Sequence, residues 1–257
     1  MNKKNEKTVL AVGCHPDDVE ILCAGTLALL KEKGWNIEIS TMTNGDCGSA
    51  TLSRKEISEI RKIEAATSAK ILNANYMCLN NDDIFLTYNR ESLLKTIDLI
   101  RNVKPDLVIT QSQQDYMIDH EVTSKIVQTA CFSAAIKNIE TGSEPFNKIP
   151  HLYYMDALEG KNIYGNEIKP TVIVDISSTM EIKEKMLKMH DSQRSWLMEH
   201  HGMDEYIIAM KNFSKKRGME IGVNYAEGFR QHLGHAYPHS NILKEELLEK
   251  VEVFKLS

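Results

Sequence analysis

The chain has 257 residues, 42% of them hydrophobic, and a formal net charge of −5. This length can bury a full core, and the mildly acidic composition argues against nucleic acid as a partner, because phosphate binding favours a basic face. The first residues pass from charged side chains directly into a strand-like run, and no apolar run reaches the roughly 18 residues of a membrane span. Five cysteines without a CxxC spacing favour reduced thiols over a disulfide framework. We therefore expect a cytoplasmic protein that binds neither nucleic acid nor membrane.

Strand-like and helix-like runs alternate through the first half of the chain. The predicted strands are 8–14, 36–43, 74–80 and 106–110, and the predicted helices are 19–33, 53–72, 90–105 and 121–136. This alternation is typical of βαβ units around a mostly parallel sheet.

The second half is less regular. Strands are predicted at 151–158 and 170–177, a helix over 178–201, and a mixture of loop and helix over 225–254. Because no repeat or linker-like run divides the chain, we expect a single domain over residues 1–257, with 180–257 as a helical and loop C-terminal part.

The tetrapeptide HPDD lies where the first strand turns into the first helix, a junction at which open α/β sheets bind ligands. His15 and Asp18 are three residues apart and can face the same way, whereas Asp17 projects elsewhere. An imidazole and a carboxylate are ordinary Zn²⁺ ligands. The alternative is helix capping by Asp17 and Asp18 with Pro16 in the first turn, and the tetrapeptide taken alone favours it.

A second junction strengthens the metal interpretation. His120 follows the strand at 106–110, again where a loop enters a helix. By itself, such a histidine is more often an ordinary helix-start residue than a ligand. Two such clusters at strand ends of one sheet could converge, which makes a His–Asp–His metal site of His15, Asp18 and His120 a reasonable hypothesis.

Five segments, in this order along the chain, resemble the PIG-L/LmbE-like zinc-dependent N-deacetylases: HPDDVEILCAGTLALL, TNGDCGS, IRKIEAA, DYMIDHEVTS and KMLKMHDSQ. The resemblance spans residues 8–195, and YAEGFR extends it to 230. It implies a Rossmann-like, LmbE-like α/β fold with helices on both faces of the sheet. The implied activity is hydrolysis of an N-acetyl group, usually on a glucosamine unit, and the implied cofactor is Zn²⁺. A His₂Asp set also accepts other divalent metals such as Fe²⁺.

Carried over residue by residue, the resemblance makes His15, Asp18 and His120 the zinc ligands. Asp17, the first aspartate of the pair, matches the general base of the family.

The resemblance also suggests two residues beside the substrate sugar. These are Arg61 in IRKIEAA and Asp83 in NNDDIFL. A solvated helix position is an equally good interpretation of Arg61, and the neighbouring Asp82 is easily confused with Asp83.

Met117 departs from the family pattern, because many relatives have a histidine there that stabilises the oxyanion or protonates the leaving amine. A thioether cannot donate a proton. Asp119, which orients that histidine in relatives, is then expected to anchor His120 or to cap the helix. We predict that His190 in KMHDSQ supplies the missing donor. The next candidates are three further histidines: His232, His235 and His239.

These features predict a hydrolase that deacetylates an N-acetylglucosamine-containing small molecule, an N-acetyl sugar or glycoside, with metal-activated water and Asp17 as the base. Two alternatives stay open: a non-catalytic, metal-containing sugar-binding relative, suggested by Met117, and a hydrolase of a different amide. Asp17 favours catalysis, because a pure binding site has little use for an unligated carboxylate beside the metal.

Loops 44–56 and 191–206, the latter with Trp196, are predicted to form the walls of the pocket. Assembly into a homo-oligomer is left open.

Overall fold

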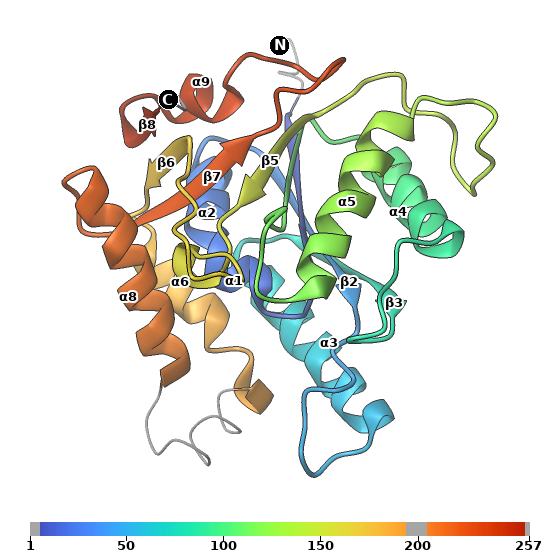
Figure 1. Ribbon diagram of the computed structural model, residues 1–257, viewed down its shortest axis with the longest axis horizontal. Helices are drawn as coiled ribbons and strands as arrows, with labels where there is room; N and C mark the ends of the chain where they lie inside the picture. Colours follow the sequence, from blue (N-terminus) through green and yellow to red (C-terminus); the bar gives the residue numbers. More distant parts are fainter. Residues whose placement is uncertain (1–5, 194–204, 255–257) are drawn as a thin grey trace.

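The computed structural model describes residues 6–193 and 205–254, which form an eight-stranded sheet with helices on both faces (Figure 1). The strands are β1 (Thr8–Gly13), β2 (Asn36–Thr43), β3 (Asn75–Asn81), β4 (Leu107–Thr110), β5 (His151–Met155), β6 (Val172–Asp175), β7 (Ala226–Gln231) and β8 (Val251–Val253). The helices are α1 (Asp18–Leu22), α2 (Ala24–Glu32), α3 (Arg54–Ile71), α4 (Arg90–Val103), α5 (Ile118–Ser133), α6 (Met180–Leu187), α8 (Glu205–Glu220) and α9 (Ile242–Leu247), with short 3₁₀ turns at Leu158–Gly160 and Leu248–Lys250.

The strand order is β3-β2-β1-β4-β5-β7-β6-β8. The first five strands in this order are mutually parallel, whereas β7 runs antiparallel to β5 and β6, and β8 runs antiparallel to β6. The sheet is therefore mixed and mostly parallel, as predicted. Residues 180–257 were expected to hold only helix and loop, but they also contribute β7 and β8 to the sheet.

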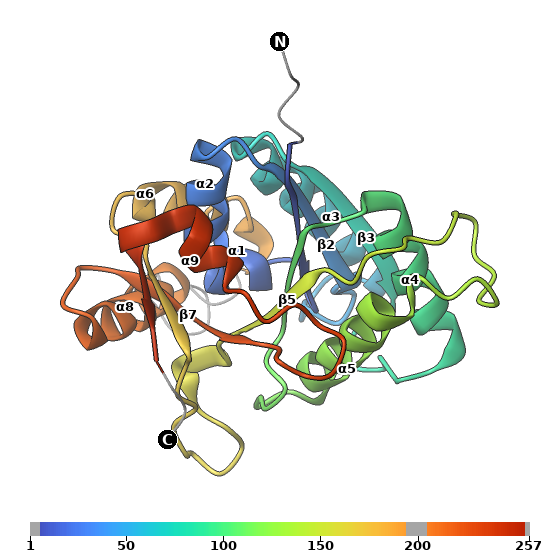
Figure 2. The same cartoon turned by 90° about the horizontal axis from the view of Figure 1, so that it is seen from above.

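The central strands are buried on both faces, which explains their nearly continuous apolar sequence. Successive side chains of a strand point to opposite faces, so Val9 and Ala11 join one core cluster and Leu10 and Val12 the other. The first cluster packs under α2, α6, α8 and α9, and the second under α4 and α5. Figure 2 shows these two helical layers on either side of the sheet.

The predicted helix over 19–33 is two helices. The backbone at Cys23 has φ −145°, which ends α1 and starts α2 on a new axis. A distant carboxylate stabilises this break, because Glu227 accepts hydrogen bonds from the amides of Gly25 and Thr26, at 2.9 and 2.8 Å. Local sequence could not reveal this partner, which explains why one continuous helix was expected.

The region of the predicted helix 178–201 also differs from expectation. Helix α6 ends at Leu187, and Trp196 lies outside the described residues. Helix α8, which was not predicted, follows the gap in the described chain. Within the described residues, no helix has both the length and the apolarity needed to cross a bilayer.

In chain order, the first strands extend the sheet to one side of β1, and the strands from β4 onwards extend it to the other side. Strands β2 and β3 lie on one side of β1, and β4 and β5 lie on the other. The carboxyl ends of β1 and β4 are therefore neighbours at a topological switch point, where open α/β sheets bind ligands. Both predicted polar clusters follow these two strands.

Candidate functional site

Asp18 fixes the turn that follows β1. Its Oδ2 accepts hydrogen bonds from the backbone amides of Cys14 and His15, at 2.9 and 2.7 Å, and from Gln111 Nε2 at 2.5 Å. Gln111 comes directly after β4, so this bond joins the two strand ends. Asp17 is the N-cap residue of α1 but makes no side-chain capping bond. The capping interpretation of HPDD is therefore wrong for both aspartates.

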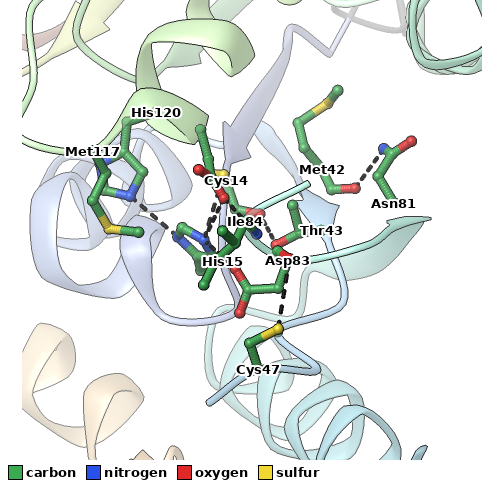
Figure 3. A network of polar contacts seen from close by, with 12 residues as sticks. Cys14, His15, Met42, Thr43, Cys47, Asn81, Asp83, Ile84, Met117 and His120 are labelled. Atoms are coloured by element: carbon green, nitrogen blue, oxygen red, sulfur yellow. Dashed lines mark hydrogen bonds and ion pairs between the residues drawn. The ribbon is translucent and has the colours of Figure 1, made fainter. Parts of the chain in front are cut away.

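His15, Asp18 and His120 converge from the β1 and β4 junctions. His15 Nδ1 lies 3.1 Å from His120 Nε2, and each of these nitrogens lies 3.6 Å from an oxygen of Asp18. Ligand atoms on a tetrahedral Zn²⁺ with bonds of about 2.0–2.1 Å are about 3.3–3.4 Å apart. The spacing and the donor set therefore fit a divalent ion. Figure 3 shows the two imidazoles facing each other.

Each histidine has carboxylate partners on its other ring nitrogen. His120 Nδ1 is 3.1 Å from Asp115 Oδ1, and His15 Nε2 is 2.8 Å from Asp83 Oδ1 and 3.4 Å from Asp119 Oδ2. Such partners orient metal-binding imidazoles and raise their basicity. Asp119 was expected to anchor His120 or cap its helix. It instead contacts His15, because α5 begins three residues earlier than predicted and turns this carboxylate toward the β3 loop.

Asp83 was expected beside the substrate sugar. It does line the site cavity, but its carboxylate is engaged by His15. The main contact of Asp83 is therefore with His15, a candidate metal ligand, which it holds in orientation.

The ionisation of the three converging groups favours a cation between them. Burial alone would raise the pKa of Asp18, but His120 and His15 hold it below its usual range. Burial would likewise lower the pKa of both histidines, yet neighbouring acidic groups raise both, with Cys14 the largest contributor for His15 and Asp18 for His120. Acidic neighbours, among which carboxylates are the most numerous, thus outweigh the effect of burial on both imidazoles.

Cys14 also lies close enough to be considered as a ligand. Its Sγ is 3.7 Å from His15 Nε2, and together with His120 these residues could surround an ion. Burial raises the pKa of the Cys14 thiol to about 11, and its sulfur faces the nitrogen that Asp83 also contacts. A thiol must lose its proton to bind a metal, so Asp18 is the better third ligand.

Asp17 stands beside this triad but has different partners. Its Oδ2 accepts a hydrogen bond from Tyr206 Oη at 2.5 Å and lies 3.3 Å from Arg61 Nη2. Burial raises the pKa of Asp17, and the Arg61 charge opposes that rise. Its backbone φ of 138° is a strained conformation of the kind that concentrates at functional sites.

Arg61 fixes the loop around Asp17. It is only 4% exposed, so the solvated-helix interpretation is wrong. Its Nη2 donates to the Pro16 carbonyl at 2.8 Å, and the TNGDCGS loop wraps closely around its guanidinium. A Cβ at Gly45 or Gly48 would come within 2.7 or 2.5 Å of Arg61 Nη1, which explains the two glycines. Arg61 reaches the site cavity, but its hydrogen bonds and its ion pair position Asp17 and the loop.

These groups open on one cavity of about 600 Å³, which we call the site cavity. Its polar end holds the predicted residues His15, Asp17, Asp18, Arg61, Asp83 and His120. Its remaining wall is largely apolar and aromatic: Ile21, Leu22, Ile84, Tyr116, Met117, Leu158, Tyr206, Ala209 and Met210. Gly48 and Gln193, from the two loops predicted to form walls, also line it.

His190 does not line the site cavity. It is fully buried, with its Nε2 3.3 Å from Glu20 Oε1. His190 is therefore not placed at the wall of the site cavity, although its charge and that of Asp17 influence each other, and its role as proton donor stays a prediction. The other candidate donors are also remote from the site cavity: His232 and His239 line a different pocket, and His235 is exposed.

Three contributors were not predicted. Asp115 and Gln111 lie on the loop after β4. The polar sequence of this loop, directly after a buried strand, could have indicated that its residues contribute to the site. Tyr206 is the last residue of the loop 191–206 that was predicted to line the pocket, but its contact with Asp17 spans 189 residues of sequence and had no signal.

Comparison with known proteins gives a consistent picture. Residues 10–131 match the family model of PIG-L, described as GlcNAc-PI de-N-acetylase. The chain is 26% identical over 230 residues to a diacetylchitobiose deacetylase of Thermococcus kodakarensis (87% of this chain, 82% of the relative). It is also 26% identical over 237 residues to a 4-oxalmesaconate hydratase of Pseudomonas putida (88% and 89%). The structure of N,N'-diacetylchitobiose deacetylase from Pyrococcus horikoshii superposes with a TM-score of 0.76 at 28% identity, covering 92% of this chain and 89% of that one.

Proposed function

We propose that this chain is a metal-dependent hydrolase of the PIG-L family that removes an N-acetyl group from an N-acetylglucosamine-containing small molecule, on the basis of the family match over residues 10–131 and the similarity to diacetylchitobiose deacetylases. The observation that carries the proposal is the convergence of His15, Asp18 and His120 beside an unligated Asp17 on one cavity. The cavity volume lies within the range of small-molecule sites.

We assign Zn²⁺ as the ion, held by His15 Nδ1, His120 Nε2 and the Asp18 carboxylate. When bound, the ion would supply Lewis-acid activation of the acetyl carbonyl and of water. Asp115 and Asp83 hold the two imidazoles in orientation by engaging their other nitrogens.

Asp17 is the proposed general base. Tyr206 and Arg61 both engage its Oδ2, which leaves Oδ1 to accept a proton from the attacking water. When the C–N bond breaks, the same carboxylic acid can return this proton to the departing amine, so that acetate and the free amine are the products. This route does not need a second acid, which accounts for Met117 at a position where many relatives are expected to have a histidine.

The charge of the site cavity separates this proposal from hydration of a carboxylated substrate, as named for the Pseudomonas relative. Among the described residues that line the cavity, Asp17, Asp18 and Asp83 are acidic, and Arg61 is the arginine. Arg61 is already committed to Asp17 and to backbone carbonyls. With Zn²⁺ counted, these charges cancel, so the cavity has no excess positive charge for an anionic substrate and better suits a neutral N-acetyl sugar.

The test is acetate release. Protein stripped with a chelator and reloaded with Zn²⁺ would be incubated with N,N'-diacetylchitobiose, N-acetylglucosamine and aryl N-acetylglucosaminides. We expect acetate and free amine in equal amounts, lost on stripping and restored by Zn²⁺. A folded, zinc-loaded protein that releases no acetate from any of these sugars would contradict the proposal and favour a sugar-binding relative or a hydrolase of another amide.

A further inference from the structure

A second pocket, of about 720 Å³, lies over the antiparallel half of the sheet. It is lined by residues of β5, β6, β7 and β8 and by the loop that follows β4, and it shares no lining residue with the site cavity. We call it the β7 pocket. The residues that line it are Gln113, Tyr154, Thr171, Val172, Arg230, Gln231, His232, Leu233, His239, Asn241, Val253 and Phe254.

Strand alternation turns Arg230 away from the hydrophobic core on its side of the sheet. Its neighbour Phe229 is fully buried among the residues under α2 and α8, so Arg230 points to the opposite face. There it lies directly across from Tyr154 in the β5–β7 register. The side chain is half-buried and lines the β7 pocket.

Arg230 makes no ion pair within 4.0 Å among the described residues, and the carboxylate whose charge acts on it is that of Asp156. Its one hydrogen bond in this part of the chain runs from Nη2 to Ser112 Oγ, at 3.1 Å. Asp156, two residues beyond Tyr154 in β5, instead accepts a hydrogen bond from Arg217 Nε at 2.7 Å. A partly buried, unpaired guanidinium is costly to fold around, which makes it a candidate for ligand binding.

Three other polar side chains around the β7 pocket, Gln231, Asn241 and His232, are already engaged. Gln231 Nε2 donates to the Ser240 carbonyl at 2.8 Å, and Asn241 Oδ1 accepts from the amide of Lys244 at 2.9 Å. His232 Nδ1 is 2.8 Å from Tyr154 Oη, and burial lowers the pKa of this imidazole. Arg230 is therefore the cationic anchor that the pocket offers to a ligand.

Apolar side chains also line the β7 pocket. Leu233, Val253 and Phe254 are 58%, 51% and 44% exposed, and all three line the β7 pocket. Large apolar side chains gathered around one uncommitted charge are the usual composition of a small-molecule site. Such a site matches a ligand with an anionic head and a hydrocarbon body.

We propose that the β7 pocket binds an apolar organic acid, with its carboxylate on the guanidinium of Arg230 and its hydrocarbon chain against Leu233 and Phe254. The planar guanidinium can donate two parallel hydrogen bonds to a carboxylate. This site is independent of the proposed deacetylation. The two sites share only the loop after β4, in which Ser112 contacts Arg230 and the adjacent Gln111 contacts Asp18.

The test is a calorimetric titration of the full chain with octanoate, 1-octanol and acetate. The first ligand carries both the charge and the chain, the second lacks the charge, and the third lacks the chain. Octanoate should bind measurably more tightly than either control. It should bind chelator-treated and zinc-loaded protein alike, because the β7 pocket lies apart from the candidate metal ligands.

Matched variants separate the β7 pocket from the site cavity. Arg230→Gln should weaken octanoate binding about 10- to 100-fold, as expected when a charge-assisted contact is lost. Phe254→Ser should weaken octanoate binding while leaving acetate binding unchanged, and the control Arg90→Gln, at an exposed position on α4, should change neither. Arg230→Lys keeps the positive charge but lacks the planar guanidinium, so it should bind octanoate with intermediate affinity. This variant controls for a folding defect in Arg230→Gln. Octanoate affinity that is unaffected by Arg230→Gln, or no octanoate binding at all, would overturn the proposal whether or not the protein deacetylates sugars.

Discussion

The parallel and antiparallel halves of the sheet use buried charges differently. At the carboxyl end of the parallel strands, Asp18, Asp83 and Asp115 surround His15 and His120, and Asp18 and Asp83 also line the site cavity. This excess of carboxylates favours an added cation, because like charges held together are costly without one.

In the antiparallel half, buried charges are matched within the protein. Lys183 Nζ donates to Glu227 Oε1 at 2.6 Å, and both side chains are almost fully buried. Arg217 pairs with Asp156 at 2.7 Å. Burial of charge alone therefore does not identify a functional site, whereas a set of charges without matching partners that faces a cavity does. Among the described residues of the antiparallel half, Arg230 is partly buried without such an ion pair, and for that reason we infer that it binds a ligand.

Removal of a candidate ligand should have the largest effect on the parallel half. His120→Asn should abolish both metal retention and acetate release, by more than the roughly 10- to 100-fold expected when only an outer partner of a ligand is lost. Metal content by mass spectrometry and acetate release would be measured on one preparation. His151→Asn, in a part-buried histidine whose Nε2 is 3.0 Å from Ser240 Oγ, is the matched control. Full metal retention in His120→Asn would remove His120 from the ligand set.

Removal of one partner from the antiparallel half should instead affect stability. Lys183→Met leaves Glu227 buried without its cation and should lower the free energy of unfolding by about 3 kcal/mol. This is at the low end for such a change, because the amides at the start of α2 still bind Glu227. Urea denaturation would measure it, with Lys95→Met, at an exposed i,i+4 pair with Glu91, expected to cost under about 1 kcal/mol. An equal loss in the free energy of unfolding for the two variants would show that the buried pair stabilises the protein no more than the exposed pair does.

Asp115 sharpens the comparison, because it acts on a ligand and not on the ion. Asp115→Asn should weaken metal affinity about 10- to 100-fold by removing the carboxylate that orients His120. Competition with a chromophoric chelator would measure this affinity. Asp82→Asn, next to Asp83 but paired with the exposed Arg54, should leave it unchanged. A similar affinity in both variants would limit Asp115 to a role in loop structure.

Tyr206→Phe should have the smallest effect. It removes the hydroxyl that holds Asp17 Oδ2, so we expect kcat to fall about tenfold with little change in KM, as for loss of one hydrogen bond to a charged group. Tyr116→Phe, at another tyrosine of the site cavity, is the control. A change in KM alone would assign Tyr206 to substrate binding and not to positioning of the base.

The parallel half of the fold could be predicted from sequence because its strands are continuous apolar runs. β2 matches its predicted bounds, and β1 and β4 match to within one residue. In contrast, β7 is the polar run AEGFRQ, and its place in the sheet depends on pairing with β5 and β6. The break between α1 and α2 likewise depends on Glu227, which is about 200 residues away in sequence.

The candidate site shows the same division. The convergence of His15, Asp18 and His120 could be predicted because they follow two strands of one sheet, whereas the role of Asp17 was suggested by the family resemblance. The roles of Arg61, Asp83 and Asp119 could not be predicted, because their contacts depend on how α3, the β3 loop and the first turn of α5 approach the HPDD turn. Met117 could be recognised as a departure from the family, but the contact of Tyr206 on α8 with Asp17 was beyond the reach of local patterns.

The most direct test of the central claim compares wild-type protein with Asp17→Asn, both loaded with Zn²⁺, for bound metal and for acetate release from N,N'-diacetylchitobiose or the best sugar substrate found. Because Asp17 is proposed to move the proton and not to hold the ion, Asp17→Asn should keep its zinc and lose about 10²- to 10⁴-fold in rate, as expected for loss of a general base. Undiminished acetate release by a zinc-loaded Asp17→Asn protein would contradict the account.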